Sequence, residues 1–357
     1  MRFYINEFEK QHLNLSEQAW IIVNEDIRNF YNDKSKSSLS GFLNQVFYNF
    51  YQFSDATISL RCIEQKAKLE ELFATTTDGD EIIKKKHVEL LLDQYKQTLI
   101  HKFNSYPKGV GRKFRINKKN LEILNNSADS QYYHSIGQYF KAVIEEYTNL
   151  KMCEREAIFF NETIEIITYA MQNKRKIKIA QYPTVTSSAK GIFGRRYYVS
   201  PYKILTDKVS MFNYLICYAE EIDSEGEIFE TIPASFRISR IDKIDVMKSM
   251  SGFLSIAEKA KLEEEIHRKT PQFMAGEVVD IKVAFTSKGL EDFERVVYLR
   301  PAKYEKIDEK TYVFHCTELQ ARNYFFKFGM DAVILEPISL REKFKLKYQS
   351  AFDAYNE

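Results

Sequence analysis

Two arginines three positions apart, Arg237 and Arg240, are the side chains best suited to hold a phosphate in this chain of 357 residues. A guanidinium group can grip a phosphate through two parallel hydrogen bonds, and it can also stack on a base. Unpaired bases stack on aromatic rings at roughly 1 to 3 kcal/mol each, and three tyrosines could supply such rings: Tyr182, Tyr202 and Tyr214. These residue types predict a nucleic-acid or nucleotide-like ligand. Two alternatives stay open, because tyrosines commonly pack in cores and because Asp242 and Asp245 could pair with the arginines.

The basic residues are concentrated in two tracts that contain no acid. The 28 residues between Asp93 and Glu122 hold eight bases, and the 41 residues between Glu165 and Asp207 hold eight more. The rest of the chain carries 36 bases against 50 acids, so the formal net charge of +2 conceals an acidic body with two basic surfaces. The second tract would supply contacts to a nucleic-acid backbone from Lys174, Arg175, Lys176, Lys178, Lys190, Arg195 and Arg196.

The motifs of common active sites are absent from the sequence. The six histidines form no HExxH or Cys-His spacing, and there is no GxSxG or P-loop pattern. The run Gly109-Val110-Gly111 lacks the third glycine of a dinucleotide-binding loop and precedes a basic strand. We therefore expect a protein that is not an enzyme and that holds no metal and no cofactor. Catalysis by carboxylate pairs that only the fold brings together is the open alternative.

The cysteines and the hydropathy pattern indicate the compartment. Four cysteines lie far apart with no CxxC pair, which is typical of neither a zinc ribbon nor a disulfide scaffold. No run approaches the roughly 18 apolar residues of a membrane span, and the first residues form no apolar signal core. We expect a soluble cytoplasmic protein that does not associate with membranes.

Two segments of the N-terminal half share one pattern. In each, a short strand and a helix precede a helix capped by serine, Ser38 in the first segment and Ser135 in the second. The two capped helices carry apolar residues at the same spacing of 0, 3, 4, 7, 8 and 11, first Leu39, Phe42, Leu43, Val46, Phe47 and Phe50, then Ile136, Tyr139, Phe140, Val143, Ile144 and Tyr147. This similarity predicts an internal repeat, residues 1–56 and 108–152, with a helical spacer over residues 57–107.

Each repeat resembles the ribbon-helix-helix motif, the second one more loosely because its first helix is short. In that family two strands pair into a ribbon over four helices, and the ribbon enters the major groove of DNA. By this resemblance the side chains that face the partner are Lys10, His12 and Asn14 in the first copy and Lys113, Arg115 and Asn117 in the second. The sequence leaves open whether the ribbon serves only for dimerisation, and whether the strands pair within one chain or between two.

Residues 153–247 predict a leading helix followed by a small bent antiparallel sheet or barrel. The alternating pairs Ile177/Ile179, Tyr214/Ile216 and Phe236/Ile238 mark its short strands. This segment resembles the WYL domain, an Sm-like β-barrel that binds nucleic acid or nucleotide-type ligands. The match rests on a strand ending in Tyr182, then Pro201-Tyr202, Asn213-Tyr214-Leu215, Phe236-Arg237 and Arg240-Ile241, with Asn213 in the place where the family usually has Trp. The resemblance implies a site at Tyr182, Arg195, Arg196, Tyr202, Asn213, Tyr214, Arg237 and Arg240.

The remaining sequence predicts a linker and a third folded part. Residues 248–275 predict a linker with one charged helix, and residues 276–357 an α/β unit that resembles the C-terminal extension of WYL proteins, where we expect dimerisation. The fold class is therefore α+β: ribbon-helix-helix in one copy or two with a helical spacer, then a WYL barrel, then the extension.

This combination of domains resembles the WYL accessory proteins of type VI-D CRISPR systems. The resemblance implies a homodimer that binds single-stranded RNA and enhances an RNA-guided effector ribonuclease. Two other hypotheses remain: a transcription regulator that binds duplex DNA through the ribbon and senses a ligand in the WYL pocket, and a structural adaptor that contacts an acidic protein. The preference for RNA over DNA, the ligand of the WYL pocket and the effector partner stay open at this point.

Overall fold

The computed structural model describes residues 10–33, 37–75, 81–107, 109–182, 195–222, 228–274 and 276–356. The chain divides into two compact units, Met1–Glu162 and Thr163–Glu357. Helices are combined with three antiparallel sheets of two, five and four strands, which confirms the α+β class. The loop with Lys190, which was predicted to contribute a basic contact, lies outside the described residues.

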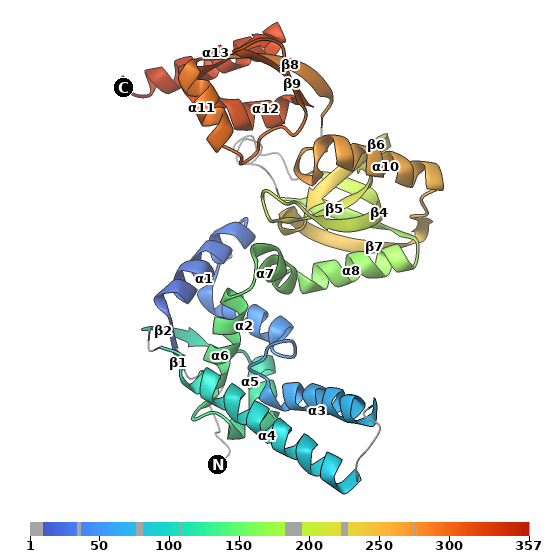
Figure 1. Ribbon diagram of the computed structural model, residues 1–357. Coiled ribbons are helices and arrows are strands. Elements are labelled where there is room, and N and C mark those ends of the chain that lie inside the picture. Colours follow the sequence, from blue (N-terminus) through green and yellow to red (C-terminus); the bar gives the residue numbers. More distant parts are fainter. Residues whose placement is uncertain are drawn as a thin grey trace. The chain divides into compact units, whose positions relative to one another are not determined.

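The N-terminal unit is built around a two-stranded ribbon. Its elements in chain order are β1 (Lys10–Leu15), α1 (Glu17–Phe30), α2 (Leu39–Phe50), α3 (Ile58–Thr75), α4 (Glu81–Asn104), β2 (Val110–Arg115), α5 (Lys118–Asn126), the 3-10 helix Ala128–Gln131, α6 (Ile136–Thr148) and α7 (Met152–Phe159). Although a long stretch of chain separates β1 from β2, the two strands lie side by side in Figure 1, and α3 and α4 form the predicted helical spacer between them.

The two strands pair antiparallel within the same chain, from Lys10 opposite Arg115 to Leu15 opposite Val110. Two glycines lie at this close approach. A Cβ atom on Gly109 would lie 1.5 Å from the carbonyl oxygen of Leu15, and one on Gly111 would lie 2.3 Å from Oδ1 of Asn14. Gly109 is therefore required by the close approach of the Leu15 backbone, whereas a side chain at position 111 would meet only the end of the Asn14 side chain, which can move.

Helices α2 and α6 form the core beneath the ribbon. The apolar positions predicted from the common spacing are buried on both helices, apart from Leu39, which is half-buried. The Phe47 and Phe140 rings stack with their centroids 4.6 Å apart and their planes 7° from parallel. Each helix begins where the sequence predicts, because the hydroxyl oxygen of Ser38 accepts from the Gly41 amide and that of Ser135 accepts from the Gln138 amide.

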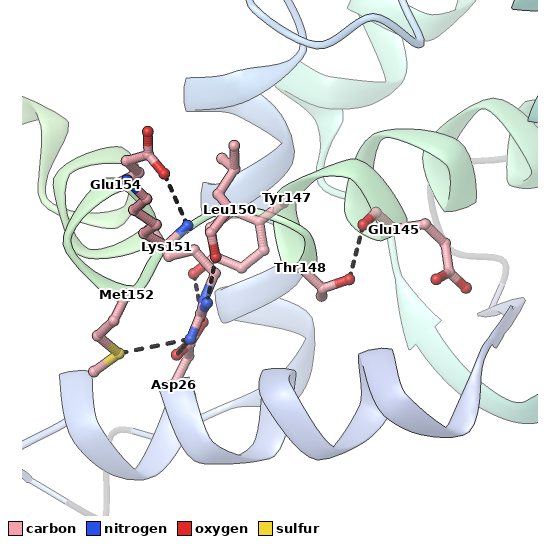
Figure 2. Close-up of polar contacts among 9 residues, drawn as sticks. Asp26, Glu145, Tyr147, Thr148, Leu150, Lys151, Met152 and Glu154 are labelled. Atoms are coloured by element: carbon pink, nitrogen blue, oxygen red, sulfur yellow. Dashed lines mark hydrogen bonds and ion pairs between the residues drawn. The ribbon is translucent and has the colours of Figure 1, made fainter.

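A buried ionic cluster attaches α7 to this core (Figure 2). Asp26 of α1 is fully buried and accepts hydrogen bonds from Nε and Nη2 of Arg155 at 2.8 and 3.1 Å, and from the Tyr147 hydroxyl at 2.8 Å. Arg155 also donates to the Leu150 carbonyl at 2.6 Å. Burial raises the pKa of the Asp26 carboxyl, and the hydrogen bonds from Arg155 and Tyr147 oppose that change. A buried charge is costly without a partner, so Asp26, Tyr147 and Arg155 must stay in contact. This requirement fixes α1, α6 and α7 relative to one another.

The helix predicted to lead the WYL domain is two helices, α7 and α8 (Asn161–Gln172), separated at Phe160. Residues 153–162, which were predicted to begin the WYL domain, group with the N-terminal unit. Arg155 explains the difference, because its pairing with Asp26 ties α7 to α1.

The second unit begins with a five-stranded sheet. Its strands are β3 (Arg175–Gln181), β4 (Arg196–Thr206), β5 (Asn213–Ile222), β6 (Ile228–Arg237) and β7 (Ile241–Ser251), in the order β6-β5-β4-β3-β7. The predicted barrel is not closed. The chain passes from β6 through the 3-10 turn Ile238–Arg240 into β7, which pairs with β3, and β6 pairs with β5 alone among the described residues.

The segment predicted as a linker belongs to this sheet unit. Strand β7 extends to Ser251, and α10 (Ile256–Lys269) follows. Leu262 of α10 is fully buried in a cluster with Tyr214, Ile216 and Tyr218 of β5. The charged residues of α10 lie around this single inward leucine, which is why its sequence resembles a solvated linker.

A four-stranded sheet follows, in the order β11-β8-β10-β9. Its elements are β8 (Val278–Phe285), α11 (Ser287–Arg295), β9 (Tyr304–Lys306), β10 (Thr311–Thr317), α12 (Glu318–Phe325), the 3-10 segment Phe326–Asp331, β11 (Ala332–Glu336) and α13 (Ile338–Asp353). Its core is strongly aromatic, with Phe285, Phe314 and Phe325 at the centre. Among the described helices of the whole chain, none is both long and apolar enough to cross a membrane.

Candidate nucleic-acid interfaces

The outward face of the ribbon gathers five of the six side chains predicted there. Directly opposed residues of an antiparallel pair lie on the same face, and the register places Lys10 opposite Arg115, His12 opposite Lys113, and Asn14 opposite Gly111. All of these positions are exposed, whereas Leu13, Leu15 and Phe114 point into the core. We name the outward set, Lys10, His12, Asn14, Lys113 and Arg115, the ribbon face.

The charges of the ribbon face are unfavourable for the protein by itself. Lys10 and Arg115 are directly opposed cations, and like charges in that position destabilise a strand pair. None of the positions on this face is acidic. The ribbon face therefore gains stability from an anion outside the ribbon.

Asn117, the sixth predicted residue, lies beyond the end of β2. Its side-chain oxygen accepts from the Asn120 amide at 2.8 Å and so caps α5, while its own amide donates to Asn44 at 2.9 Å. The asparagine of the second copy is a helix cap rather than a member of the ribbon face.

Arg112 and Trp20 lie behind the ribbon. The Arg112 guanidinium lies 4.4 Å from the centroid of the Trp20 ring, and the indole Nε1 donates to the Val110 carbonyl at 2.7 Å. These contacts hold β2 against α1 and fix the position of the strand that presents Lys113 and Arg115.

In the second unit, four of the eight predicted residues meet at the end of β3. The Tyr182 amide donates to the Arg240 carbonyl, and the Gln181 amide donates to the Arg195 carbonyl. Arg196 lies opposite Ala180 on one side of β3, and Lys243 of β7 lies opposite Ala180 on the other. All four cations of this group are exposed. We name it the β3-end cluster: Tyr182, Arg195, Arg196, Arg240 and Lys243.

Lys243 was missed in the sequence because it stands between acids in Ile-Asp-Lys-Ile-Asp. Only the pairing of β3 with β7 brings it beside the predicted arginines. Strand alternation would not have found it, because Lys243 is two positions from the buried Ile241 and yet is exposed.

Acids lie close to the β3-end cluster. Arg195 Nε lies 3.6 Å from Glu221 Oε1, and the Arg195 side chain is 70% exposed. A hydrogen bond with Tyr197, together with Glu221, raises the pKa of the Arg195 guanidinium, so this group stays charged. Part of the cluster's charge is therefore balanced inside the protein.

The other four predicted residues have partners inside the protein. Tyr214 is 7% exposed in the cluster beneath α10, and this burial argues against the predicted stacking role. The Tyr202 hydroxyl donates to Glu263 at 2.6 Å, and Asn213 is buried and accepts from Thr206 at 2.8 Å. Arg237 donates from Nε to Ser239 at 2.7 Å, with its guanidinium over the Phe212 ring. The burial of Tyr214 agrees with the alternative that the sequence left open for the tyrosines, which is packing in the core.

Across the part of the chain that the structure describes, no three His, Cys, Asp or Glu side chains are placed to hold a metal ion. The ribbon face presents cations, a histidine and an asparagine amide, and the β3-end cluster presents cations and one tyrosine ring. Such groups bind polyanions and flat bases.

Comparison with known structures shows a shared fold. The chain matches a solved protein described as "Crystal structure of a CRISPR Cas-related protein" with a TM-score of 0.73 and 23% identity, over 99% of this chain and 95% of that chain. A proteasome accessory factor B/C (PafBC) of Arthrobacter aurescens matches with a TM-score of 0.28 and 12% identity, over 82% of this chain and 49% of that one, which is too low to imply a common fold. No protein-family model and no curated protein matches the sequence.

Proposed function

We propose that this chain is a non-catalytic accessory protein that binds single-stranded RNA and enhances a CRISPR RNA-guided ribonuclease. The observation that carries the proposal is the β3-end cluster, where strand pairing and a backbone hydrogen bond bring the exposed cations Arg196, Arg240 and Lys243 to the strand end that carries the half-buried Tyr182. Exposed cations follow a sugar-phosphate backbone, and an aromatic ring beside them can take an unpaired base.

The CRISPR part of the proposal rests on the whole fold. The solved protein that matches almost the entire chain is described as CRISPR Cas-related. The order of domains also resembles that of the WYL accessory proteins. Both likenesses support an accessory role, and the surfaces described above indicate how such a protein would engage RNA.

The proposal includes a homodimer formed through residues 276–357. Helix α13 exposes Ile338, Leu346 and Phe352 to solvent, and a second copy could cover these side chains. Light scattering of the full chain measures this directly. A mass near 42.1 kDa at all concentrations would contradict it.

The first experiment compares labelled single-stranded RNA with duplex DNA in titrations at the same salt concentration. We expect the RNA to bind more tightly and its affinity to fall as salt rises. The substitution Arg240→Ala in a folded variant should weaken RNA binding. Cleavage by an RNA-guided ribonuclease should then increase when the wild-type chain is added, and less so with the variant.

A second candidate function is favoured by the ribbon face. The major groove of duplex DNA admits a two-stranded ribbon, and this chain completes such a ribbon without a partner. A transcription regulator would use it to read base edges through His12, Asn14 and Lys113. Tighter binding of duplex DNA than of RNA, lost on Lys113→Ala, would support the regulator and contradict the accessory protein. If neither polymer binds, the remaining hypothesis is an adaptor that contacts an acidic protein.

A further inference from the structure

A basic groove continues from the ribbon face between helices α2 and α5. It is shallow and largely open to solvent, with a volume of about 610 Å³. Arg115, Lys118 and Lys119 contribute three cations to its lining, and Tyr48 of α2 contributes an exposed ring. No acidic residue lines it, and Arg115 belongs to both the groove and the ribbon face. We name this feature the α2–α5 groove.

The three cations are not neutralised within the described part of the protein, where none of them forms an ion pair with a carboxylate. The Lys119 ammonium lies 3.6 Å from the centroid of the Tyr48 ring, which holds it at the groove. Lys118 and Lys119 also occupy the first turn of α5, which contains no acid. Cations are disfavoured at a helix N-terminus, so this placement costs stability unless an anion lies nearby.

The floor of the groove is held by hydrogen bonds centred on Asn44. Asn44 donates to the carbonyls of Ser40 and Arg115 at 2.6 and 2.7 Å, and its Oδ1 accepts from the Asn117 amide at 2.9 Å. This network fixes the end of β2 against the start of α5. The cations therefore project from a pre-organised support, which lowers the cost of ordering them around a ligand.

At the other end of the ribbon, a second set of residues is equivalent to the residues of the α2–α5 groove. The helix caps Ser16 and Asn117 are equivalent in the two repeats, and with that alignment His12 is equivalent to Lys113, which lies opposite it at the centre of the ribbon. The residues equivalent to Lys118 and Lys119 are Glu17 and Gln18. The residue equivalent to Tyr48, when α2 and α6 are aligned on Ser38 and Ser135, is Glu145.

The two ends of the ribbon therefore differ in charge, and the second end has one cation, Lys141, at the position equivalent to Asn44, where its ammonium donates to the Pro107 carbonyl at 2.8 Å. Glu145 uses its carboxylate inside the protein, where it accepts from the amide and hydroxyl of Ser16 at 2.6 and 2.8 Å. Glu17 lies in the first turn of α1, where an acid is favourable for the helix and unfavourable for a phosphate. On the ribbon itself, Lys10 and Arg115 lie at the basic end, and Asn14 and Gly111 lie at the other.

We infer that the α2–α5 groove binds the sugar-phosphate backbone of duplex DNA lying along the ribbon, and that only this end of the ribbon holds a phosphate. The inference rests on the duplex binding proposed for the ribbon face and adds a direction to it. A ribbon built from two identical chains has two equivalent ends, whereas this fused ribbon has one anchoring end and one neutral or acidic end. Its ligand is bound in a single orientation and does not require a palindromic site.

The test uses the full chain and a labelled DNA duplex titrated over a range of salt concentrations. We expect the double variant Lys118→Ala, Lys119→Ala to bind more weakly and its log K against log salt to be shallower by about 1.8, because each lost phosphate contact removes about 0.9 from the slope. The variant should be at least as stable to heat as the wild type, since alanine favours the helix and two disfavoured cations are gone.

Two matched double variants control for net charge and for position. Lys85→Ala with Lys86→Ala removes the same charge from exposed sites on α4, and it should leave the slope near the wild-type value. Glu17→Ala with Gln18→Ala changes the equivalent end of the ribbon and should not weaken binding.

Three results would overturn the inference. If the wild type does not bind the duplex, the duplex function of the ribbon fails and the inference fails with it. If the wild type binds but Lys118→Ala, Lys119→Ala has the same slope, or if Glu17→Ala, Gln18→Ala loses as much affinity, the ribbon function survives and the one-ended groove is wrong. If only single-stranded RNA binding depends on the two lysines, the assignment to a duplex is wrong.

Discussion

The ribbon face and the β3-end cluster are both basic, but they differ in what surrounds their cations. On the ribbon, Lys10 lies opposite Arg115 and no acid occupies the outward positions of either strand. At the end of β3, Arg195 approaches Glu221, and Lys243 is flanked by Asp242 along β7. The first surface cannot balance its own charge, whereas the second does so in part.

The difference separates two modes of binding. An unbalanced, rigid surface gains most of its affinity from phosphates and should show a steep dependence on salt. A partly balanced surface with a nearby tyrosine should depend less on salt and more on stacking. The supports beneath the two surfaces also differ, because the ribbon unit relies on the buried Asp26–Arg155 pair and the sheet unit relies on apolar packing under α10.

The largest expected effect is a loss of stability in the ribbon unit when its buried Asp26–Arg155 pair is broken. Asp26→Asn keeps the shape of the side chain but leaves the buried Arg155 without its counter-charge, which should cost about 3 to 5 kcal/mol. Hydrogen exchange measured by mass spectrometry should show faster exchange across residues 10–162 and unchanged protection in β3 to β7. The exposed neighbour Glu25→Gln is the control and should have no effect. Equal loss of protection in both units would show that they are not independent.

The next effect concerns the ribbon face itself. The triple variant Lys10→Ala, Lys113→Ala, Arg115→Ala should reduce the salt slope of duplex binding by about 1.8, because Lys10 and Arg115 each lose a phosphate contact worth about 0.9, whereas Lys113 faces base edges. Its thermal stability should be equal or slightly higher, because the opposed cations Lys10 and Arg115 are gone. Removing Lys68, Lys85 and Lys86 from the helical spacer is the matched control. An unchanged slope in the ribbon variant would contradict the charge argument.

An effect of similar size is expected for the β3-end cluster. Arg196→Ala, Arg240→Ala and Lys243→Ala together should reduce the salt slope of single-stranded RNA binding by about 2, since each contact to a single strand contributes about 0.7. Duplex binding by the ribbon should stay the same. The control removes three exposed lysines elsewhere in the unit, Lys259, Lys261 and Lys345. Loss of both RNA and duplex binding would mean that the two surfaces serve one ligand.

The smallest expected effect is a gain in affinity for RNA. Glu221→Gln should free Arg195 from its partner and tighten RNA binding by a few tenths of a kcal/mol, because pairs as exposed as this one contribute little. The comparison variant is Glu264→Gln, an exposed acid on α10. Affinity measured at low salt gives the best resolution, and weaker binding by Glu221→Gln would show that the carboxylate positions Arg195 instead of competing for it.

The sequence signals that place the side chains of the ribbon face on the outward side of the ribbon are local. Leu13 and Leu15 alternate with His12 and Asn14, and alternation decides which side of a strand faces the core. Serine caps and a common apolar spacing were enough to locate α2 and α6. Which strand pairs with which is a property of the whole fold. Local patterns therefore did not predict that His12 lies opposite Lys113.

The structure brings four of the eight residues of the predicted WYL site to the end of β3 and places the other four elsewhere, and the reason is again non-local. Tyr214 is buried because α10 covers that part of β5, and α10 lies in a segment whose many charges predicted a linker. The prediction of a closed barrel was wrong for a related reason. The path of the chain after the turn at Ile238–Arg240 depends on the pairing of β7 with β3. Spacing along the sequence carries no information on such contacts.

Trp20 is the only tryptophan of the chain, and it lies at the back of β2, hydrogen-bonded to Val110 and covered by Arg112. The indole emission of the whole molecule therefore originates beneath the ribbon. Events confined to the five-stranded sheet should leave that emission unaltered, whereas any displacement of β2 changes the polarity around the indole. The protein thus carries a built-in optical probe that distinguishes ligands of its two surfaces without a label.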